Sequence, residues 1–248
     1  IITEKPLSTS FANCNSLGKI VKKNKIKLIV NTHRSFSPNF LMVKELFKKY
    51  NEKPYSMFIN SPSAGLGNMG STFFDLGLFF FNENPLSVTG WIDKTGTINP
   101  RGKKFKDPGG HGVLNFNNNK KLFFDLSENT GLPYTICIKS ENLEILIDEI
   151  NNQFLLKERP KIMRKKPLYF YLFKPKTSKL KIKHKFDVVK MTCFSIKNIF
   201  KKNFTYKNLD NAISVMECIF SVHVSSKENK IIRLPLPKKY HKLKINFA

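Results

Sequence analysis

The sequence predicts two parts: the end of a parallel α/β domain in residues 1–50, and an α+β domain with a large, mostly antiparallel sheet in residues 51–248. Two observations predict the first part. A β-prone run at 1–3 leads through Glu4-Lys5-Pro6 into an amphipathic helix, and a second β-branched run follows at 26–30. The second part is predicted by consecutive strand-like runs that short turns connect, followed by two helices.

The tripeptide Glu4-Lys5-Pro6 connects the first strand to a helix with apolar residues at three- and four-residue spacing, namely Phe11, Cys14, Leu17 and Val21. Strand, helix and strand in this order form a crossover between parallel strands. Ligands of such sheets bind at the carboxyl ends of the strands, where Lys5 lies. A second copy of the tripeptide, at 52–54, follows a charged helix, and we interpret it as a loop.

The chain has no initiator Met and opens inside a strand of the crossover. A parallel strand needs neighbours on both sides, and no residues before Ile1 are present to supply them. We therefore expect this sequence to be a fragment that lacks the N-terminal half of its first domain. A free-standing protein of 248 residues is the alternative.

The remaining elements follow from apolar patterning. Ser37 and Pro38 predict the start of a helix that runs to about Tyr50. Further helices are expected at 71–82, 186–200 and 209–224, and residues 61–70 form a Gly-rich loop. Strands are expected at 55–60, 86–92, 112–116, 121–126, 134–138, 144–147, 153–156 and 230–234, with a hairpin turn at 117–119.

The net charge of +25 first suggests a nucleic-acid partner. Only five of the 43 basic residues are Arg, however, and the guanidinium fork is favoured for recognising phosphates and bases. A solvated lysine surface is the better interpretation, so we expect no nucleic-acid partner. The densest basic segment, 157–185, contains four aromatic residues that could stack bases, although such a pattern is more often an exposed strand pair with charged gatekeepers.

Cysteines and histidines give no sign of a metal site. Cys14, Cys137, Cys193 and Cys218 are far apart, and we expect all four to be reduced core residues. The five histidines are scattered, so no metal is predicted. No apolar run approaches membrane-spanning length, and a cytoplasmic protein without a membrane partner is the default expectation.

A second motif runs from Gly65 to Phe79. Glycines before a helix leave its N-terminal amides free for a ligand. Asp75 is the acidic residue of an otherwise apolar helical turn, and it either satisfies backbone donors or takes part in catalysis. Gly77 in mid-helix indicates close packing against another element.

Together these motifs resemble the glucose–fructose oxidoreductase / inositol dehydrogenase / MocA (Gfo/Idh/MocA) family. Glu4-Lys5-Pro6 resembles its Glu-Lys-Pro signature, and residues 30–38 resemble its V-G-F-N-R-R-F-S-P segment. Residues 67–79 are similar to its G-G-G-x-x-x-D-x-G-x-H helix. Residues 85–88, 138–149 and 210–235 resemble the strand, hairpin and closing elements that follow.

The resemblance implies an NAD- or NADP-dependent oxidoreductase of carbohydrate metabolism, acting on a sugar, polyol or sugar nucleotide. The first domain would be the C-terminal part of a Rossmann domain, and the second would bind substrate and build a homo-oligomer through its sheet. Lys5 and Asp75 would be catalytic. Cofactor contacts would come from Glu4, Lys5, Pro6 and Arg34, and substrate contacts from His33, Asn68 and Phe79.

One departure from the family pattern concerns the chemistry. The family's proton-carrying His stands four residues after the Asp, and Phe79 occupies that position here. The phosphate-binding Gly-x-Gly-x-x-Gly turn is expected before residue 1. A catalytically degenerate family member, serving as a ligand sensor or assembly module, is therefore the second hypothesis, and a nucleic-acid binder is the third.

Overall fold

The computed structural model describes residues 1–62, 65–93, 99 and 101–247. It begins with β1 (Ile2–Thr3), α1 (Phe11–Lys23) and β2 (Ile29–Val30), and β1 pairs in parallel with β2. The predicted crossover is therefore confirmed. The 3₁₀ turn η1 (His33–Phe36) leads to α2 (Pro38–Lys49), where Ser37 caps the helix and Pro38 is its first residue, as predicted.

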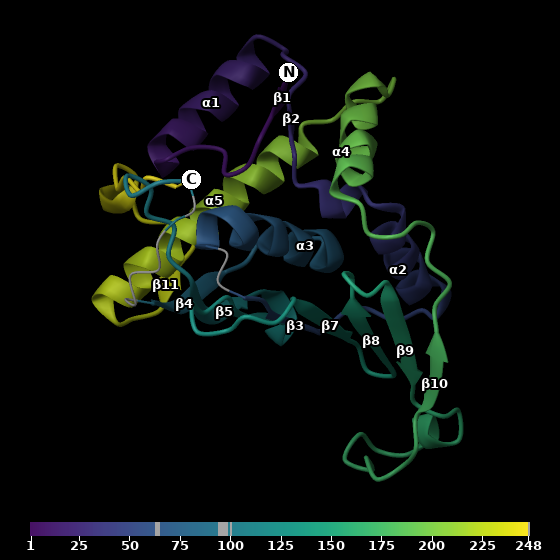
Figure 1. Cartoon of the computed structure of the whole chain (residues 1–248). Helices are drawn as coiled ribbons and strands as arrows, with labels where there is room; N and C mark the ends of the chain where they lie inside the picture. Colours follow the sequence, from purple (N-terminus) through teal and green to yellow (C-terminus); the bar gives the residue numbers. More distant parts are fainter. Residues whose placement is uncertain (63–64, 94–98, 100, 248) are drawn as a thin grey trace.

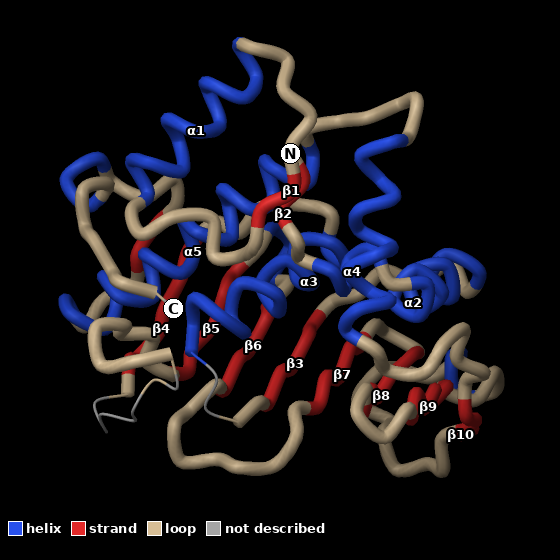
Figure 2. Tube along the Cα trace, turned by 45° about the horizontal axis from the view of Figure 1, so that its top comes forward, coloured by secondary structure: helices blue, strands red, loops and turns tan. Residues whose placement is uncertain are grey.

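A nine-stranded sheet forms the body of the molecule (Figure 2), with the strand order β10-β9-β8-β7-β3-β6-β5-β4-β11. Its strands are β3 (Ser56–Asn60), β4 (Ser87–Ile92), β5 (Gly110–Asn115), β6 (Lys121–Asp125), β7 (Thr135–Lys139), β8 (Leu143–Asp148), β9 (Gln153–Glu158), β10 (Lys176–Lys179) and β11 (Ile232–Arg233). The pairing of β3 with β6 is parallel and the other pairings are antiparallel. The predicted fold class is confirmed, while β10 was not predicted.

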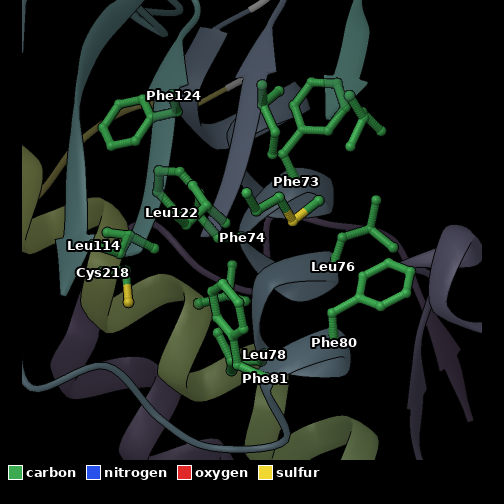
Figure 3. Close-up of a cluster of buried hydrophobic side chains, with 14 of the residues drawn as sticks. Phe73, Phe74, Leu76, Leu78, Phe80, Phe81, Leu114, Leu122, Phe124 and Cys218 are labelled. Atoms are coloured by element: carbon green, nitrogen blue, oxygen red, sulfur yellow. The ribbon is translucent and has the colours of Figure 1, made fainter. Parts of the chain in front are cut away.

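Helices cover one face of this sheet (Figure 1). They are α3 (Ser71–Phe81) and the long α5 (Lys207–Glu228), together with α2, whereas α4 (Val188–Lys197) packs on η1 farther from the strands. Side chains of α3 such as Phe74 and Phe81 point into the core beside Leu122 and Phe124 (Figure 3). A Cβ atom on Gly77 would lie 2.4 Å from a methyl group of Leu122, so the predicted close packing of this glycine is confirmed.

The opposite face of the sheet has no helix over it in Figures 1 and 2. Its side chains include Phe58 and Trp91, which are 40% and 48% exposed, and Phe58 stacks on Phe123 with ring centroids 4.7 Å apart. These side chains border a shallow concavity of about 690 Å³. The strands thus alternate between a buried face and an open, largely apolar one.

The structure corrects two sequence-based expectations about local features. Cys14 and Cys218 are buried free thiols, but Cys137 is half-buried and Cys193 is exposed, so neither of these two belongs to the core. Residues 65–70 form a π-helical turn, η2, that continues into α3, where a loop was expected. Residues 63 and 64 of that expected loop lie outside the described residues.

Within the described residues, no three His, Cys, Asp or Glu side chains gather in a way that could hold a metal ion. A search of the same residues found no helix with the length and apolarity required to cross a membrane.

Candidate active site

Lys5 lies just past the carboxyl end of β1, and the peptide bond that joins it to Pro6 is cis. Its ammonium donates to the backbone oxygen of Asn68 at 3.0 Å and also bonds the Asn68 side-chain oxygen. Burial lowers the pKa of Lys5 to about 8, while Glu4 raises it and Arg101 lowers it. Two predicted site residues, Lys5 and Asn68, are therefore in contact. With this pKa, part of the Lys5 population is neutral near physiological pH.

His33 of η1 is close enough to Lys5 for their charges to interact. Burial lowers the pKa of His33 to about 3, and the positive charges of Arg34 and Lys5 act in the same direction. The imidazole is therefore neutral at pH 7. Its Nε2 atom is buried and has no hydrogen-bond partner among the described residues.

The N-terminal amides that precede α3 are not free, contrary to expectation. The Asp107 carboxylate accepts from Gly67 N at 2.6 Å and from Asn68 N at 2.8 Å. Gly65, Gly67 and Gly70 follow a strand and have the Gly-x-Gly-x-x-Gly spacing, but a Cβ at Gly67 would lie 2.3 Å from the Phe247 ring. Protein atoms fill the space that a pyrophosphate would need, so this turn is not a dinucleotide cradle.

Asp75 is 1% exposed, and neither carboxylate oxygen has a hydrogen-bond partner of normal geometry among the described residues. Burial raises the pKa of Asp75 to about 6, against the opposite effect of the nearby Ser35 and Thr32 hydroxyls. A buried carboxylate that nearby hydroxyls satisfy only in part costs stability, and such groups concentrate at functional sites.

Unpartnered polar atoms gather where η1 packs on α3. In the described part of the chain they are His33 Nε2 and Arg34 Nη1 from η1, and Thr72 Oγ1 and both Asp75 oxygens from α3. Buried polar atoms are normally hydrogen-bonded, to protein or to ordered water. The unpartnered atoms of these two contacting elements are therefore candidates for contacts with a polar ligand or with ordered water.

Asp75 and Phe79 both line a pocket of about 350 Å³, as their four-residue spacing on one helix face predicts. Lys5 is not among its lining residues, although the family resemblance assigns both Lys5 and Asp75 to the catalytic site. Asn68, the partner of Lys5, precedes Asp75 by seven residues, roughly 10 Å along a helix. The cation at Phe79 is instead Lys44, whose Nζ donates to the Phe79 backbone oxygen at 2.6 Å and lies 4.1 Å from the ring centroid.

Arg34 is held inside the protein. Its Nε donates to Glu149 Oε2 at 2.9 Å, and its Nη2 donates to the Tyr134 hydroxyl at 2.7 Å. That hydroxyl donates to the same Glu149 oxygen at 2.5 Å, and the guanidinium lies over the Phe73 and Tyr134 rings. Two of the three guanidinium nitrogens therefore make hydrogen bonds within the protein. The predicted cofactor contact would have to come from the third, Nη1.

Glu4 faces the polar residues after β2. Its Oε1 accepts from Asn31 Nδ2 at 2.8 Å, and Ser195 of α4 donates to Asn31 Oδ1 at 2.9 Å. Sequence reasoning missed Asn31, Asp107, Tyr134 and Glu149 as part of this region. Asp107 precedes a Pro, which signals a turn, but no sequence pattern joins it to residues 39 and 40 positions earlier.

The Asp75→Asn variant should change the pH dependence of stability. Above about pH 4 the unfolded chain ionises this carboxyl, whereas the native protein keeps its proton up to about pH 6, so stability falls as the pH rises through this window. Asn removes that loss. Relative to wild type, the variant should gain about 2 kcal/mol between about pH 4.5 and about pH 7.5, measured by urea unfolding at both pH values. A pH-independent difference would show that Asp75 keeps an ordinary pKa.

Comparisons with known proteins place this site in a shared fold. An NAD-binding oxidoreductase from Klebsiella pneumoniae superposes with a TM-score of 0.77 at 11% identity, over 95% of this chain and 73% of that one. An Agrobacterium radiobacter oxidoreductase in complex with NAD+, L-tartaric acid and magnesium gives 0.70 at 12% identity, over 94% and 72%. A super-repressor mutant of Gal80p from Saccharomyces cerevisiae gives 0.69 at 13% identity, over 94% and 71%.

No family model matches the sequence, and no curated protein matches it. Two of these three solved structures are named oxidoreductases, and the first is described as NAD-binding. The chain therefore has the fold of NAD-binding oxidoreductases, as the family resemblance implies. At identities this low, the likeness establishes the fold, and the chemistry has to be argued from the site.

Proposed function

We propose that the protein is an NAD(P)-dependent oxidoreductase that acts on a hydroxyl or ketone of a sugar, polyol or sugar nucleotide. One observation carries the proposal. Lys5, with its pKa lowered to about 8, stands at the carboxyl end of a parallel strand and interacts with His33, whose buried Nε2 has no partner among the described residues. It does so in a fold shared with NAD-binding oxidoreductases.

The residues around Lys5 fit the nicotinamide end of a dinucleotide. A carboxamide and ribose hydroxyls need hydrogen-bond partners, and His33 Nε2 and Thr72 Oγ1 are buried polar atoms that lack them. Glu4, Lys5 and Pro6 would contribute further contacts, and Arg34 Nη1 is a buried donor without a hydrogen-bond partner among the described residues. NAD(P), when bound there, supplies the acceptor or donor of the hydride.

Lys5 is the acid–base group of the proposed reaction. In oxidation its neutral amine takes the hydroxyl proton as the hydride leaves the same carbon, and in reduction its ammonium returns that proton to the oxygen. A pKa of about 8 allows both forms near neutral pH. Asn68 orients the Lys5 ammonium through two hydrogen bonds. His33, neutral at pH 7, can hold a substrate hydroxyl without repelling the cation.

Asp75 and Phe79 form the substrate end of the proposed site. The unpartnered carboxylate can accept hydrogen bonds from hydroxyl groups of a polyol, and the neighbouring pocket of about 350 Å³ has room for a small molecule. Lys44 and several asparagines add donors to its wall. The L-tartaric acid complex of the Agrobacterium structure supports a small polyhydroxy compound as the class of ligand.

The proposal can be tested with the full-length natural protein that contains this sequence. It should reduce NAD+ or NADP+ with at least one member of a panel of polyols, sugars and sugar nucleotides, followed by the absorbance of the reduced nicotinamide. Turnover should rise with pH through about 8, because oxidation needs the neutral Lys5 amine. Absence of both cofactor binding and turnover across the panel would refute it.

A second function, a ligand sensor without turnover, is favoured by Phe79. Phenylalanine cannot carry a proton, and here its ring packs on Lys44. The likeness to a super-repressor mutant of Gal80p supports the same alternative. Tight NAD(H) binding with no turnover on any substrate of the panel would favour the sensor over the oxidoreductase.

Self-association through the open face of the sheet is the third part of the proposal. Apolar faces of this size usually mark an interface, and the family resemblance points to the same sheet. In the Phe58→Glu/Phe123→Glu variant two stacked rings at the centre of the face become charged. Loss of such anchors should weaken the oligomer at least ~30-fold, seen as a monomer in sedimentation at micromolar concentration.

The matched control is Leu41→Glu, which places a charge on an exposed apolar residue of α2 instead. It should leave the oligomer intact. A wild-type protein that sediments as a monomer, or a control that dissociates as readily as the double variant, would contradict this interface.

A further inference from the structure

The segment between β9 and β10 is a basic, aromatic excursion that the proposed enzyme does not use. Residues 159–175 contain four Lys and two Arg and no acidic residue. Figure 1 shows this segment extending beyond the edge of the sheet, away from α1 and from both termini. Its position leaves it free to meet a partner without covering Lys5 or the pocket lined by Asp75 and Phe79.

The tip of this segment consists of large apolar side chains in solvent. Leu172 is 89% exposed, Tyr169 and Tyr171 are each 73% exposed, and Leu168 and Ile162 are also exposed. Tyr169 and Phe170 stack with ring centroids 4.8 Å apart. We name residues 162–172 the apolar tip. Exposed apolar side chains in such a contiguous group usually mark a contact surface.

A buried arginine holds the apolar tip in place. Arg159 is 8% exposed, its Nη2 donates to the Lys166 oxygen at 3.1 Å and to the Pro167 oxygen at 2.9 Å, and its guanidinium lies over the Phe173 ring. Arg164 Nε donates back to the Arg159 oxygen at 3.1 Å. The tip is thus ordered by these hydrogen bonds, and its side chains are preorganised for binding a partner.

Lysines lie on both sides of the exposed apolar run 168–172 of the tip. Lys165 and Lys166 precede its most exposed residues, Lys174 and Lys176 follow them, and all four are exposed. An anionic lipid bilayer matches this arrangement, because Leu, Tyr and Phe side chains enter the headgroup region while lysines beside them meet anionic headgroups. Single-stranded RNA fits less well, since it would use the aromatic rings but leave Leu168, Leu172 and Ile162 without a role.

We propose that the apolar tip and its flanking lysines dock this protein on an anionic lipid membrane, as a peripheral contact without a spanning helix. The proposal departs from the sequence-based expectation that the protein has no membrane partner. A cytoplasmic location, expected from the sequence, would expose it to the leaflet that carries anionic lipids. The site is independent of the proposed oxidoreductase activity, because none of its residues lines the pocket of Asp75 or contacts Lys5.

Co-sedimentation with vesicles tests the proposal. The wild-type protein should bind vesicles of phosphatidylcholine and phosphatidylserine and should bind pure phosphatidylcholine far less. Leu168→Ser/Leu172→Ser should lose most of this binding, and Lys165→Gln/Lys166→Gln should weaken it by about fivefold per lysine. The control Lys19→Gln/Lys23→Gln changes two exposed lysines of α1. It should bind the anionic vesicles much more tightly than either variant of the apolar tip.

All these substitutions lie on the surface and should leave the fold intact. Circular dichroism of each variant verifies this. Equal loss in the α1 control would show that overall charge alone causes binding, and would overturn the proposal. Failure of the wild-type protein to bind anionic vesicles would also overturn the proposal. If the wild-type protein fails to bind vesicles but binds single-stranded RNA through the tip, the proposal is wrong and the surface binds nucleic acid instead.

Discussion

Replacing Arg34 with Met should lower the free energy of unfolding by about 3–5 kcal/mol, because it leaves the Glu149 carboxylate buried without its cation. Both side chains of this ion pair are 3% exposed, and their atoms lie 2.9 Å apart. The loss should be measured by urea unfolding at neutral pH. Arg34 also touches the Phe73 and Tyr134 rings, so the variant removes packing as well as charge.

The double variant Arg34→Met/Glu149→Met is the control. Replacing both ions of a buried pair by apolar groups is often nearly neutral, so it should recover most of the lost stability. It also separates two roles of Arg34, because a stable double variant that binds NAD(H) poorly would support the predicted cofactor contact. A single variant as stable as wild type would show that the ion pair contributes nothing.

Replacing Lys5 with Met should reduce turnover of the full-length natural protein about 100-fold or more, the usual effect of removing one positioned electrostatic group. The substitution removes both the proton carrier and the charge that stabilises a developing alkoxide. Lys5 lies past the end of a strand and is only part-buried, so the fold should survive. Steady-state kinetics at saturating cofactor would show the loss in kcat.

Lys53→Met is a matched control, because residues 52–54 repeat the Glu-Lys-Pro sequence. In the structure that copy is a loop after α2, as predicted, and its Lys53 is exposed and has no part in the candidate site. Its turnover should equal that of wild type. If Lys5→Met is as active as Lys53→Met, the Glu-Lys-Pro resemblance does not extend to chemistry.

Much of the fold could be predicted because local patterns determine it. The spacing of Phe11, Cys14 and Val21 places α1, and Ser37-Pro38 places the start of α2. Four-residue spacing likewise places Asp75 and Phe79 on one wall of a pocket. In each case the residues that determine the feature lie within one or two helical turns of each other.

Features that depend on distant contacts were missed. The parallel pairing of β3 with β6 joins residues 65 positions apart, and Asp107 caps a turn 40 positions before it. The separation of Lys5 from Asp75 depends on which turn of α3 faces β1, and the sequence pattern carries no information about it. The strand β10 is rich in lysine, without the apolar alternation that reveals the other strands.

Protection of Lys5 from chemical labelling tests the central claim, that NAD(P) binds beside this amine. Acetylation of Lys5 and Lys53 in the full-length natural protein can be followed together by mass spectrometry, with and without saturating NAD(H) or NADP(H). The account predicts that Lys5 reacts with an apparent pKa of about 8 and that cofactor slows its labelling, while Lys53 is unaffected. Equal labelling of Lys5 with and without cofactor would contradict it.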